Sequence, residues 1–207
     1  MKIIIALAPT LAAAGLLMAP AQAQPAKARV GQPAPTFEAV TSEGEAVSLS
    51  DYEGQTVVLE WTNDGCPFVQ KHYGSNNMQG LQKRAAADGV AWLSVISSAP
   101  GEQGHVDGAG ANRLTAERKA APTAVLLDED GVVGRLYGAK TTPHMYVIDQ
   151  DGTLRYAGAI DTIASTDAAD VPRADNYVSA ALAALKANQP VTVPQTQPYG
   201  CSVKYAG

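Results

Sequence analysis

The residues from Thr56 to Thr62 carry β-branched and apolar side chains in an almost unbroken run. Such a run is too continuous for a strand with one solvated face and is typical of a central strand buried on both faces. Asn63–Gly65 ends the run, and Cys66 and Pro67 follow directly. Proline suits the first turn of a helix, where its missing N–H is no loss. The sequence therefore predicts a buried strand that leads into a cysteine at the start of a helix.

Strand and helix patterns alternate along the rest of the chain. We expect further strands over residues 90–96, 123–127, 145–148 and 154–157, a short edge strand over 46–50, helices over 67–88 with a break near 74–77, over 115–121 and over 174–188, a helical turn over 132–137 and an exposed loop over 100–112. Asp149–Gly152 carries the turn signal of a hairpin. This order predicts an α/β fold: a central mixed β-sheet flanked by helices on both faces, with the hairpin completing one edge.

The first residues have the pattern of a secretory signal peptide. A basic start is followed by the apolar stretch Ile3–Met18 and by a small-x-small cleavage site at Ala21–Ala23. A membrane anchor is the alternative, but the stretch is shorter than the roughly 20 residues that span a bilayer and a proline interrupts it. We therefore expect a signal peptide over residues 1–23, a connecting segment over 24–35, one domain over 36–188 and an extended C-terminal tail over 189–207 that carries Cys201. No cysteine lies near the cleavage site, so we expect a periplasmic or secreted protein with no stable membrane anchor after cleavage.

Composition excludes several classes of protein. Of the 207 residues, 46% are hydrophobic and 17% are charged, which indicates a globular chain rather than a disordered one. The net charge of −5 argues against nucleic acid as a partner, since such partners need a basic face. Two cysteines are too few for a disulfide scaffold or a Cys-rich zinc module, and the sequence calls for no cofactor.

The position of Cys66 favours a reactive thiol. The free N–H groups and the dipole at a helix N-terminus stabilise negative charge, so a cysteine there has a lowered pKa and is present as the nucleophilic thiolate. The alternative is that Cys66 is a small buried hydrophobic residue, as free cysteines often are.

Three segments resemble a known family. They are Glu60–Tyr73 (EWTNDGCPFVQKHY), Thr141–Asp149 (TTPHMYVID) and Pro198–Tyr205 (PYGCSVKY). Together they resemble the peroxiredoxin-like branch of the thioredoxin superfamily, which is grouped with the alkyl hydroperoxide reductase and thiol-specific antioxidant (redoxin) domains. The resemblance implies a thioredoxin-like fold with Cys66 as the attacking thiol of an oxidoreductase.

Two departures from the family patterns bear on activity. Thioredoxins carry Cys-x-x-Cys, whereas Val69 occupies the second position here. Peroxiredoxins carry Pro-x-x-x-Thr-x-x-Cys, whereas Leu59 and Asn63 stand in place of the proline and the threonine. The second departure argues against peroxidase activity.

Further site residues follow from the resemblance. Thr142 and Pro143 match the superfamily's cis-proline loop, which implies a cis peptide bond beside the reactive cysteine and backbone groups offered to a peptide substrate. His144 follows at once and lies either near Cys66 or on the surface at the start of a strand.

Three charged or titratable residues surround this motif. Glu60 lies six residues before Cys66, where thioredoxins carry a buried acid that is thought to relay protons. Burial would raise its pKa towards neutrality and suit it to acid–base work, unless one face of the strand is wet and Glu60 is solvated. Lys71 and His72 could add positive potential near the thiolate, although solvated helix residues are the default expectation.

Cys201 is the second thiol. Residues 189–201, if extended at roughly 3.3 Å each, reach about 40 Å, which is enough to return to Cys66 across a small domain. Cys201 is then a resolving cysteine, half of a static structural bridge or an unrelated surface thiol.

These observations favour an exported thiol–disulfide oxidoreductase. Cys66 would attack protein or small-molecule disulfides, and Cys201 or an external thiol donor would resolve the mixed disulfide. The first alternative is a thiol peroxidase, in which Cys66 is oxidised to a sulfenic acid. Others are a thioredoxin-fold copper carrier, if Cys66, His72, His144 and Cys201 converge, and a redox-silent binding module.

Overall fold

The computed structural model describes residues 27–207. The expected signal peptide and its cleavage site at Ala21–Ala23 lie outside the described residues. Within residues 27–207 no helix has the length and apolar character needed to cross a bilayer.

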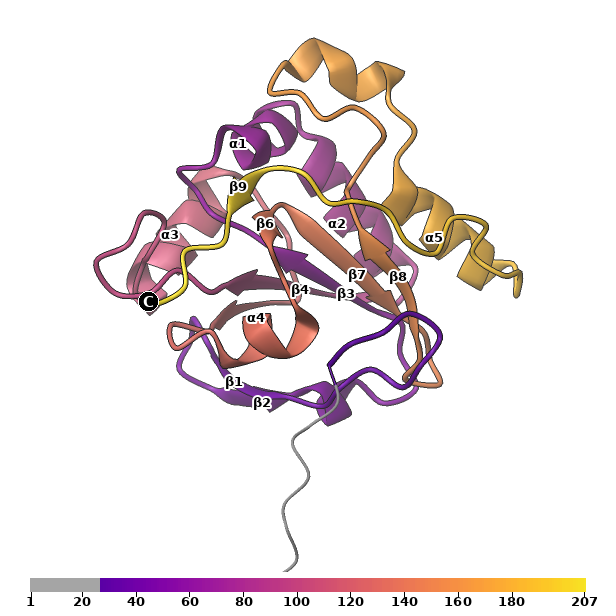
Figure 1. Cartoon of the computed structure of the whole chain (residues 1–207), viewed down its shortest axis with the longest axis horizontal. Helices are drawn as coiled ribbons and strands as arrows, with labels where there is room; N and C mark the ends of the chain where they lie inside the picture. Colours follow the sequence, from indigo (N-terminus) through magenta and orange to yellow (C-terminus); the bar gives the residue numbers. More distant parts are fainter. Residues whose placement is uncertain (1–26) are drawn as a thin grey trace, which may run out of the picture.

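A twisted mixed sheet forms the centre of the described chain (Figure 1). Its strands lie in the order β2-β1-β5-β4-β3-β7-β8. Their bounds are β1 Glu38–Thr41, β2 Ala46–Ser48, β3 Val57–Trp61, β4 Ala91–Ile96, β5 Ala124–Leu127, β7 His144–Ile148 and β8 Leu154–Gly158. Strands β3, β4 and β5 are parallel, whereas β7 and β8 form the predicted antiparallel hairpin at one edge. A separate pair joins β6 (Thr141–Thr142) to β9 (Cys201–Ser202).

Helices cover both faces of the sheet, as predicted. Their bounds are α1 Pro67–Gly74, α2 Asn77–Ala87, α3 Gly108–Glu117, α4 Val132–Tyr137 and α5 Tyr177–Lys186, with 3₁₀ turns η1 Leu49–Tyr52 and η2 Ala168–Arg173. Helices α1, α2 and α5 pack on one face, and α4 packs on the other (Figure 1). This arrangement confirms the thioredoxin-like fold class.

The position of strand β3 in the sheet explains its continuous run of apolar residues. All five of its residues are buried. Leu59 and Trp61 enter the core under α4, and Val58 enters the core under α1, α2 and α5. Because successive side chains alternate between the two faces, a strand covered on both faces must be apolar throughout, and Glu60 is the exception that needs an explanation.

The predicted helix over 115–121 is wrong in position. Helix α3 begins at Gly108, inside the segment expected to be an exposed loop, because the Asp107 carboxylate caps it by accepting from the Gly110 N–H at 2.7 Å. The glycine at position 108 allows close packing rather than marking a loop, because a Cβ there would lie 2.4 Å from the carbonyl oxygen of Ser42. Strand β1 was not predicted from the sequence.

The tail, residues 189–207, is tied to the domain on both sides of Cys201. Figure 1 shows it in yellow, running past α5 and β8 and then beside α1 to β6. Upstream, the Ala157 N–H donates to Pro194 O, and the Thr196 N–H donates to Ala157 O, both at 3.1 Å. Downstream, the Val203 side chain is buried in the core. The tail therefore closes one edge of the fold rather than hanging from it.

Candidate redox site

Cys66 is held at the corner between β3 and α1. It is the N-cap residue of α1, and Pro67 occupies the first helical turn, as the sequence predicted. The preceding turn is fixed by the Asn63 side chain, whose oxygen accepts from the Gly65 N–H at 2.9 Å. Asn63 also donates from its amide nitrogen to Gln103 O at 3.0 Å, which ties the loop before α3 over this corner.

The loop before β7 brings the second half of the site to Cys66. The Thr142–Pro143 peptide bond is cis, as the resemblance implied. The Cys66 thiol in its neutral form donates to the Thr142 carbonyl oxygen at 3.0 Å. In the β6–β9 pair Thr142 is the register partner of Cys201. Thr142 therefore contacts one cysteine and pairs with the other.

The two thiols differ in acidity. Burial alone would raise the pKa of Cys66, but the polar groups of Cys201, Thr142 and Val69 near its sulfur outweigh burial and lower that pKa. Burial, together with the nearby sulfur of Cys66 and its negative charge, raises the pKa of Cys201 to about 11. The first negative charge of the pair therefore falls on Cys66.

Exposure also separates the two thiols. Cys66 is 0% exposed, whereas Cys201 is partly exposed. Both are free in this structure. The nucleophilic sulfur therefore lies beneath the tail, and the more accessible sulfur is the one with the raised pKa.

Lys71 and His72 are not solvated, and that default expectation is wrong. Lys71 is 3% exposed and His72 is 0% exposed. Both lie within 3.8 Å of a carboxylate oxygen of Asp161, in the segment after β8. Burial, and then the nearby charge of Lys71, lower the pKa of His72 to about 4 against the opposing effect of Asp161, so the ring is neutral at pH 7. These residues face Asp161 and the tail, and no pattern along the sequence indicates this contact.

Glu60 is buried rather than solvated. It is 0% exposed, and burial raises its pKa despite the hydrogen bonds that it accepts. Its four hydrogen-bond donors are Tyr73 Oη (2.9 Å), Trp92 Nε1 (2.8 Å), Ser94 Oγ (3.1 Å) and Gln82 Nε2 (3.3 Å). Neither cysteine is among these donors. The structure thus places Glu60 in a separate network below α1 and α2.

His144 is neither a surface residue nor a hydrogen-bond partner of Cys66. It is 5% exposed, so the surface interpretation is wrong. Its Nδ1 lies 3.2 Å from Tyr146 Oη and accepts from the backbone N–H of Lys140 at 3.3 Å. Burial, with a smaller contribution from the charge of Lys140, lowers the pKa of His144 to about 3. The ring packs on Tyr146 with the centroids 4.5 Å apart.

The copper-carrier hypothesis required the histidines and cysteines to converge. No group of three or more His, Cys, Asp or Glu side chains within residues 27–207 is arranged to hold a metal ion. The hydrogen-bond partners of His72 are Tyr199 and Asn77, and those of His144 lie around Tyr146. The proposed ligand set is not assembled.

Two residues of the site were missed in the sequence. Asp161 lies in a loop and has no local signal, because its role depends on partners in α1 and in the tail. Tyr199 belongs to the third resemblance segment, yet nothing in that segment indicates that its hydroxyl donates to Asp161 Oδ1 at 2.5 Å.

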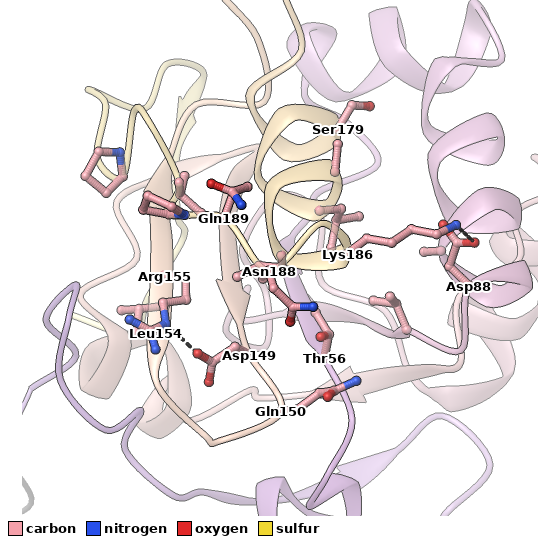
Figure 2. A pocket seen from close by; sticks show the side chains of 18 of the residues that line it. Thr56, Asp88, Asp149, Gln150, Leu154, Arg155, Ser179, Lys186, Asn188 and Gln189 are labelled. Atoms are coloured by element: carbon pink, nitrogen blue, oxygen red, sulfur yellow. Dashed lines mark hydrogen bonds and ion pairs between the residues drawn. The ribbon is translucent and has the colours of Figure 1, made fainter.

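A large cavity of the described chain lies away from this site. It has a volume of about 1040 Å³ and lies between the end of α2, α5 and the β7–β8 hairpin. Figure 2 shows the ion pairs at its rim, Lys186 with Asp88 and Arg155 with Asp149. Thr56, which precedes β3, lines it, whereas Cys66 follows the other end of β3. This cavity is not part of the redox site.

Part of the chain matches a known protein family. Residues 30–157 match the family described as AhpC/TSA, which is more than half of the chain. The chain belongs to the AhpC/TSA family. It is an oxidoreductase of the redoxin branch of the thioredoxin superfamily. The family match includes Cys66, Thr142 and Pro143 but ends before Asp161 and Cys201.

Several solved structures are similar to this AhpC/TSA chain. An uncharacterized conserved protein from Geobacillus kaustophilus is 24% identical, with a TM-score of 0.73 over 86% of this chain and 93% of that chain. A hypothetical protein from Sinorhizobium meliloti 1021 is 20% identical, with a TM-score of 0.70 over 89% and 98%. A putative thiol:disulfide interchange protein DsbE from Chlorobium tepidum is 25% identical, with a TM-score of 0.51 over 63% and 85%. Comparison with curated proteins gave no match.

Proposed function

We propose that this AhpC/TSA-family chain is an exported thiol–disulfide oxidoreductase that cycles between two free thiols and a Cys66–Cys201 disulfide. The observation that carries the proposal is the arrangement of the two cysteines about one residue: the Cys66 thiol donates to the Thr142 carbonyl oxygen at 3.0 Å, and Thr142 is the register partner of Cys201. The similarity to a putative thiol:disulfide interchange protein supports the same reaction class.

The exchange takes place in two steps. The Cys66 thiolate attacks one sulfur of a substrate disulfide, so that a Cys66–substrate disulfide forms and the other substrate sulfur leaves as a thiolate. Cys201 then loses its proton and attacks the Cys66 sulfur, which forms the Cys66–Cys201 disulfide and releases the second substrate thiolate. An external dithiol returns the protein to its reduced form and is itself oxidised. Because Cys66 is 0% exposed, the first step requires the tail to move aside.

Turnover of a peptide–glutathione mixed disulfide, with a reduced dithiol in excess, tests this proposal. Cys66→Ser should abolish turnover. Cys201→Ser should retain the first step and accumulate mixed disulfide on Cys66, detected by mass spectrometry. Full turnover by Cys66→Ser contradicts the proposal, and an unreactive Cys66 in the wild type favours a redox-silent binding module.

A thiol peroxidase is the second candidate, and the AhpC/TSA match favours it. The Cys66 thiolate would attack one oxygen of a hydroperoxide, forming a sulfenic acid and releasing water or an alcohol after protonation. Condensation with the Cys201 thiol would then give the disulfide and water. Leu59 and Asn63, at the positions of the peroxiredoxin proline and threonine, argue against it. Steady-state rates with hydrogen peroxide and with a mixed disulfide, measured on one preparation, separate the two candidates.

The site of action is part of the proposal. The signal-peptide pattern in residues 1–23 supports export to the periplasm or beyond, where a disulfide persists. Intact-mass analysis of the exported protein should give a chain that begins near Gln24. A chain that keeps Met1 in the membrane fraction contradicts export.

A further inference from the structure

The residue two positions before Cys201 is fixed from several sides. The Tyr199 hydroxyl donates to Asp161 Oδ1 at 2.5 Å, and it lies 3.3 Å from His72 Nε2. Its ring packs on Phe68 with the centroids 5.7 Å apart, and the Lys71 ammonium lies 5.8 Å from the ring centroid. Tyr199 is therefore the contact between the tail and the first turns of α1, the helix that begins at Cys66.

The hydrogen bonds around Tyr199 run in one direction. The Asn77 side-chain amide lies 2.9 Å from His72 Nδ1 and donates to it, because an amide N–H₂ cannot accept. The neutral His72 ring then carries its proton on Nε2 and donates to the Tyr199 oxygen. The Tyr199 O–H in turn donates to Asp161, whose charge is offset by Lys71 at 3.8 Å. Along this chain each hydrogen bond has a defined donor and acceptor, so the Tyr199 hydroxyl has a single preferred orientation.

The link from Tyr199 to Cys201 is short and closely packed. Only Gly200 separates them, with φ of +136°, and a Cβ there would lie 2.0 Å from the Thr142 carbonyl oxygen. That carbonyl is the one that the Cys66 thiol contacts. A shift of Tyr199 is therefore transmitted directly to Cys201, because the intervening backbone already touches the cis-proline loop.

We propose that Tyr199 is a positioning residue for the exchange, holding Cys201 against Cys66 through its hydrogen bond to the buried Asp161–Lys71–His72 cluster. The inference rests on the proposed function. It adds the residue that determines the effective concentration of the Cys201 thiol at Cys66. Loss of the Tyr199 hydroxyl should lower the effective concentration of Cys201 at Cys66. It should also remove part of the hydrogen bonding that stabilises the Cys66 thiolate.

The first test measures disulfide formation in glutathione buffers, using the full chain. Oxidised glutathione takes two electrons and two protons from the dithiol, giving the Cys66–Cys201 disulfide and two reduced glutathiones. We expect Tyr199→Phe to lower this equilibrium constant by about tenfold or more, since a hydrogen bond to a charged group contributes about 1.5 kcal/mol or more. Tyr205→Phe is the matched control, because the Tyr205 hydroxyl also fixes the tail, donating to Ala139 O at 2.9 Å. It should change the constant by less than about twofold.

The second test separates positioning from general loosening of the fold. Iodoacetamide labelling across pH gives the pKa of Cys66 in the wild type and in Tyr199→Phe, each with and without Cys201→Ala. Tyr199→Phe should raise the pKa of Cys66 more when Cys201 is present than in the Cys201→Ala background, which lacks the thiol but keeps the backbone N–H. A structural effect would be equal in both backgrounds. Phe68→Leu, which removes the ring stacked on Tyr199, should act in the same direction if Tyr199→Phe does not fold.

Several results overturn the inference. Equal equilibrium constants for the two tyrosine variants, or a shift in the pKa of Cys66 that is as large in the Cys201→Ala background as with Cys201 present, contradict a positioning role. If the wild type forms no Cys66–Cys201 disulfide at all, the proposed function falls together with the inference. If the wild type forms it and Tyr199→Phe forms it equally well, only the inference falls.

Discussion

Two of the buried carboxylates in residues 27–207, Glu60 and Asp161, lie beside α1, and only Asp161 is connected to the tail that carries Cys201. Both accept a hydrogen bond from a tyrosine hydroxyl. The donors to Glu60 are all neutral and come from within the domain, and burial raises its pKa. Asp161 has the Lys71 ammonium beside it, and it accepts hydrogen bonds from the nearby Ile163 N–H and from a tyrosine of the tail.

The difference shows what a buried acid can contribute. A carboxyl group surrounded by neutral donors has all its hydrogen bonds within the domain, and these bonds join β3 to its neighbouring helices and strand. A carboxylate with a cation beside it and one donor on a distant segment fixes that segment in place. Glu60 was predicted as a site residue because it interrupts an apolar strand and lies six residues before Cys66, where thioredoxins carry a buried acid. In space, Asp161 is the acid that is connected to the segment carrying Cys201.

The largest effect should come from Asp161→Ala. The substitution leaves the Lys71 ammonium, whose side chain is 0% exposed, without its carboxylate. Removal of one partner of a buried ion pair costs about 3–5 kcal/mol, because the remaining charge stays desolvated. Urea unfolding of the reduced protein measures this loss. A loss below about 1 kcal/mol would show that Lys71 reaches solvent by itself and would break the comparison.

Gly200→Ala should have the next largest effect. The new Cβ would lie 2.0 Å from the Thr142 carbonyl oxygen, so the tail must shift away from the cis-proline loop. We expect a loss of about 2 kcal/mol in the free energy of unfolding from this overpacking. Gly44→Ala is the control, since Gly44 also has a positive φ (+85°) but nothing within 4 Å of its Cβ position, and it should cost about 1 kcal/mol. Equal losses for the two variants would show that the tail is not closely packed at Gly200.

Glu60→Gln should have the smallest effect and a distinctive pH dependence. At pH 4 we expect a loss of about 1 kcal/mol, because the new N–H₂ group faces N–H and O–H groups that had donated to the carboxyl oxygens. The native state keeps the Glu60 proton to a higher pH than the unfolded chain does. The wild type therefore has this contribution to stability in full below about pH 4.3 and loses it as the pH rises through the raised pKa.

The difference between wild type and Glu60→Gln should consequently narrow as the pH rises from 4 to 8. Urea unfolding at a series of pH values measures it. A difference that widens with pH would mean that the native state favours the charged form of Glu60, and would contradict the raised pKa.

Much of the fold follows from local pattern. The continuous apolar run of β3, the proline after Cys66 and the turn at Asp149–Gly152 each specify one element from neighbouring residues. Helix α3 and strand β1 escaped prediction because their sequences are weak and tertiary contacts support them: Gly108 is needed for its approach to Ser42, and β1 pairs with β5.

The site divides in the same way. The positions of Cys66 and of the Thr142–Pro143 loop follow from motifs that the AhpC/TSA family shares. The burial of Lys71 and His72 depends on Asp161 and Tyr199, which lie about 90 and 130 residues farther along the chain and close over α1 only in the folded state. No periodicity or spacing along the sequence encodes such a meeting.

The central claim is that Cys66 and Cys201 form one redox pair. Non-reducing peptide mapping of the full chain, equilibrated with oxidised and reduced glutathione and quenched with acid, tests it most directly. The account predicts a linked species that contains the Cys66 and Cys201 peptides and disappears on reduction, with little glutathione on either cysteine. Glutathione bound to Cys66 with Cys201 left free, or links only between molecules, would contradict it.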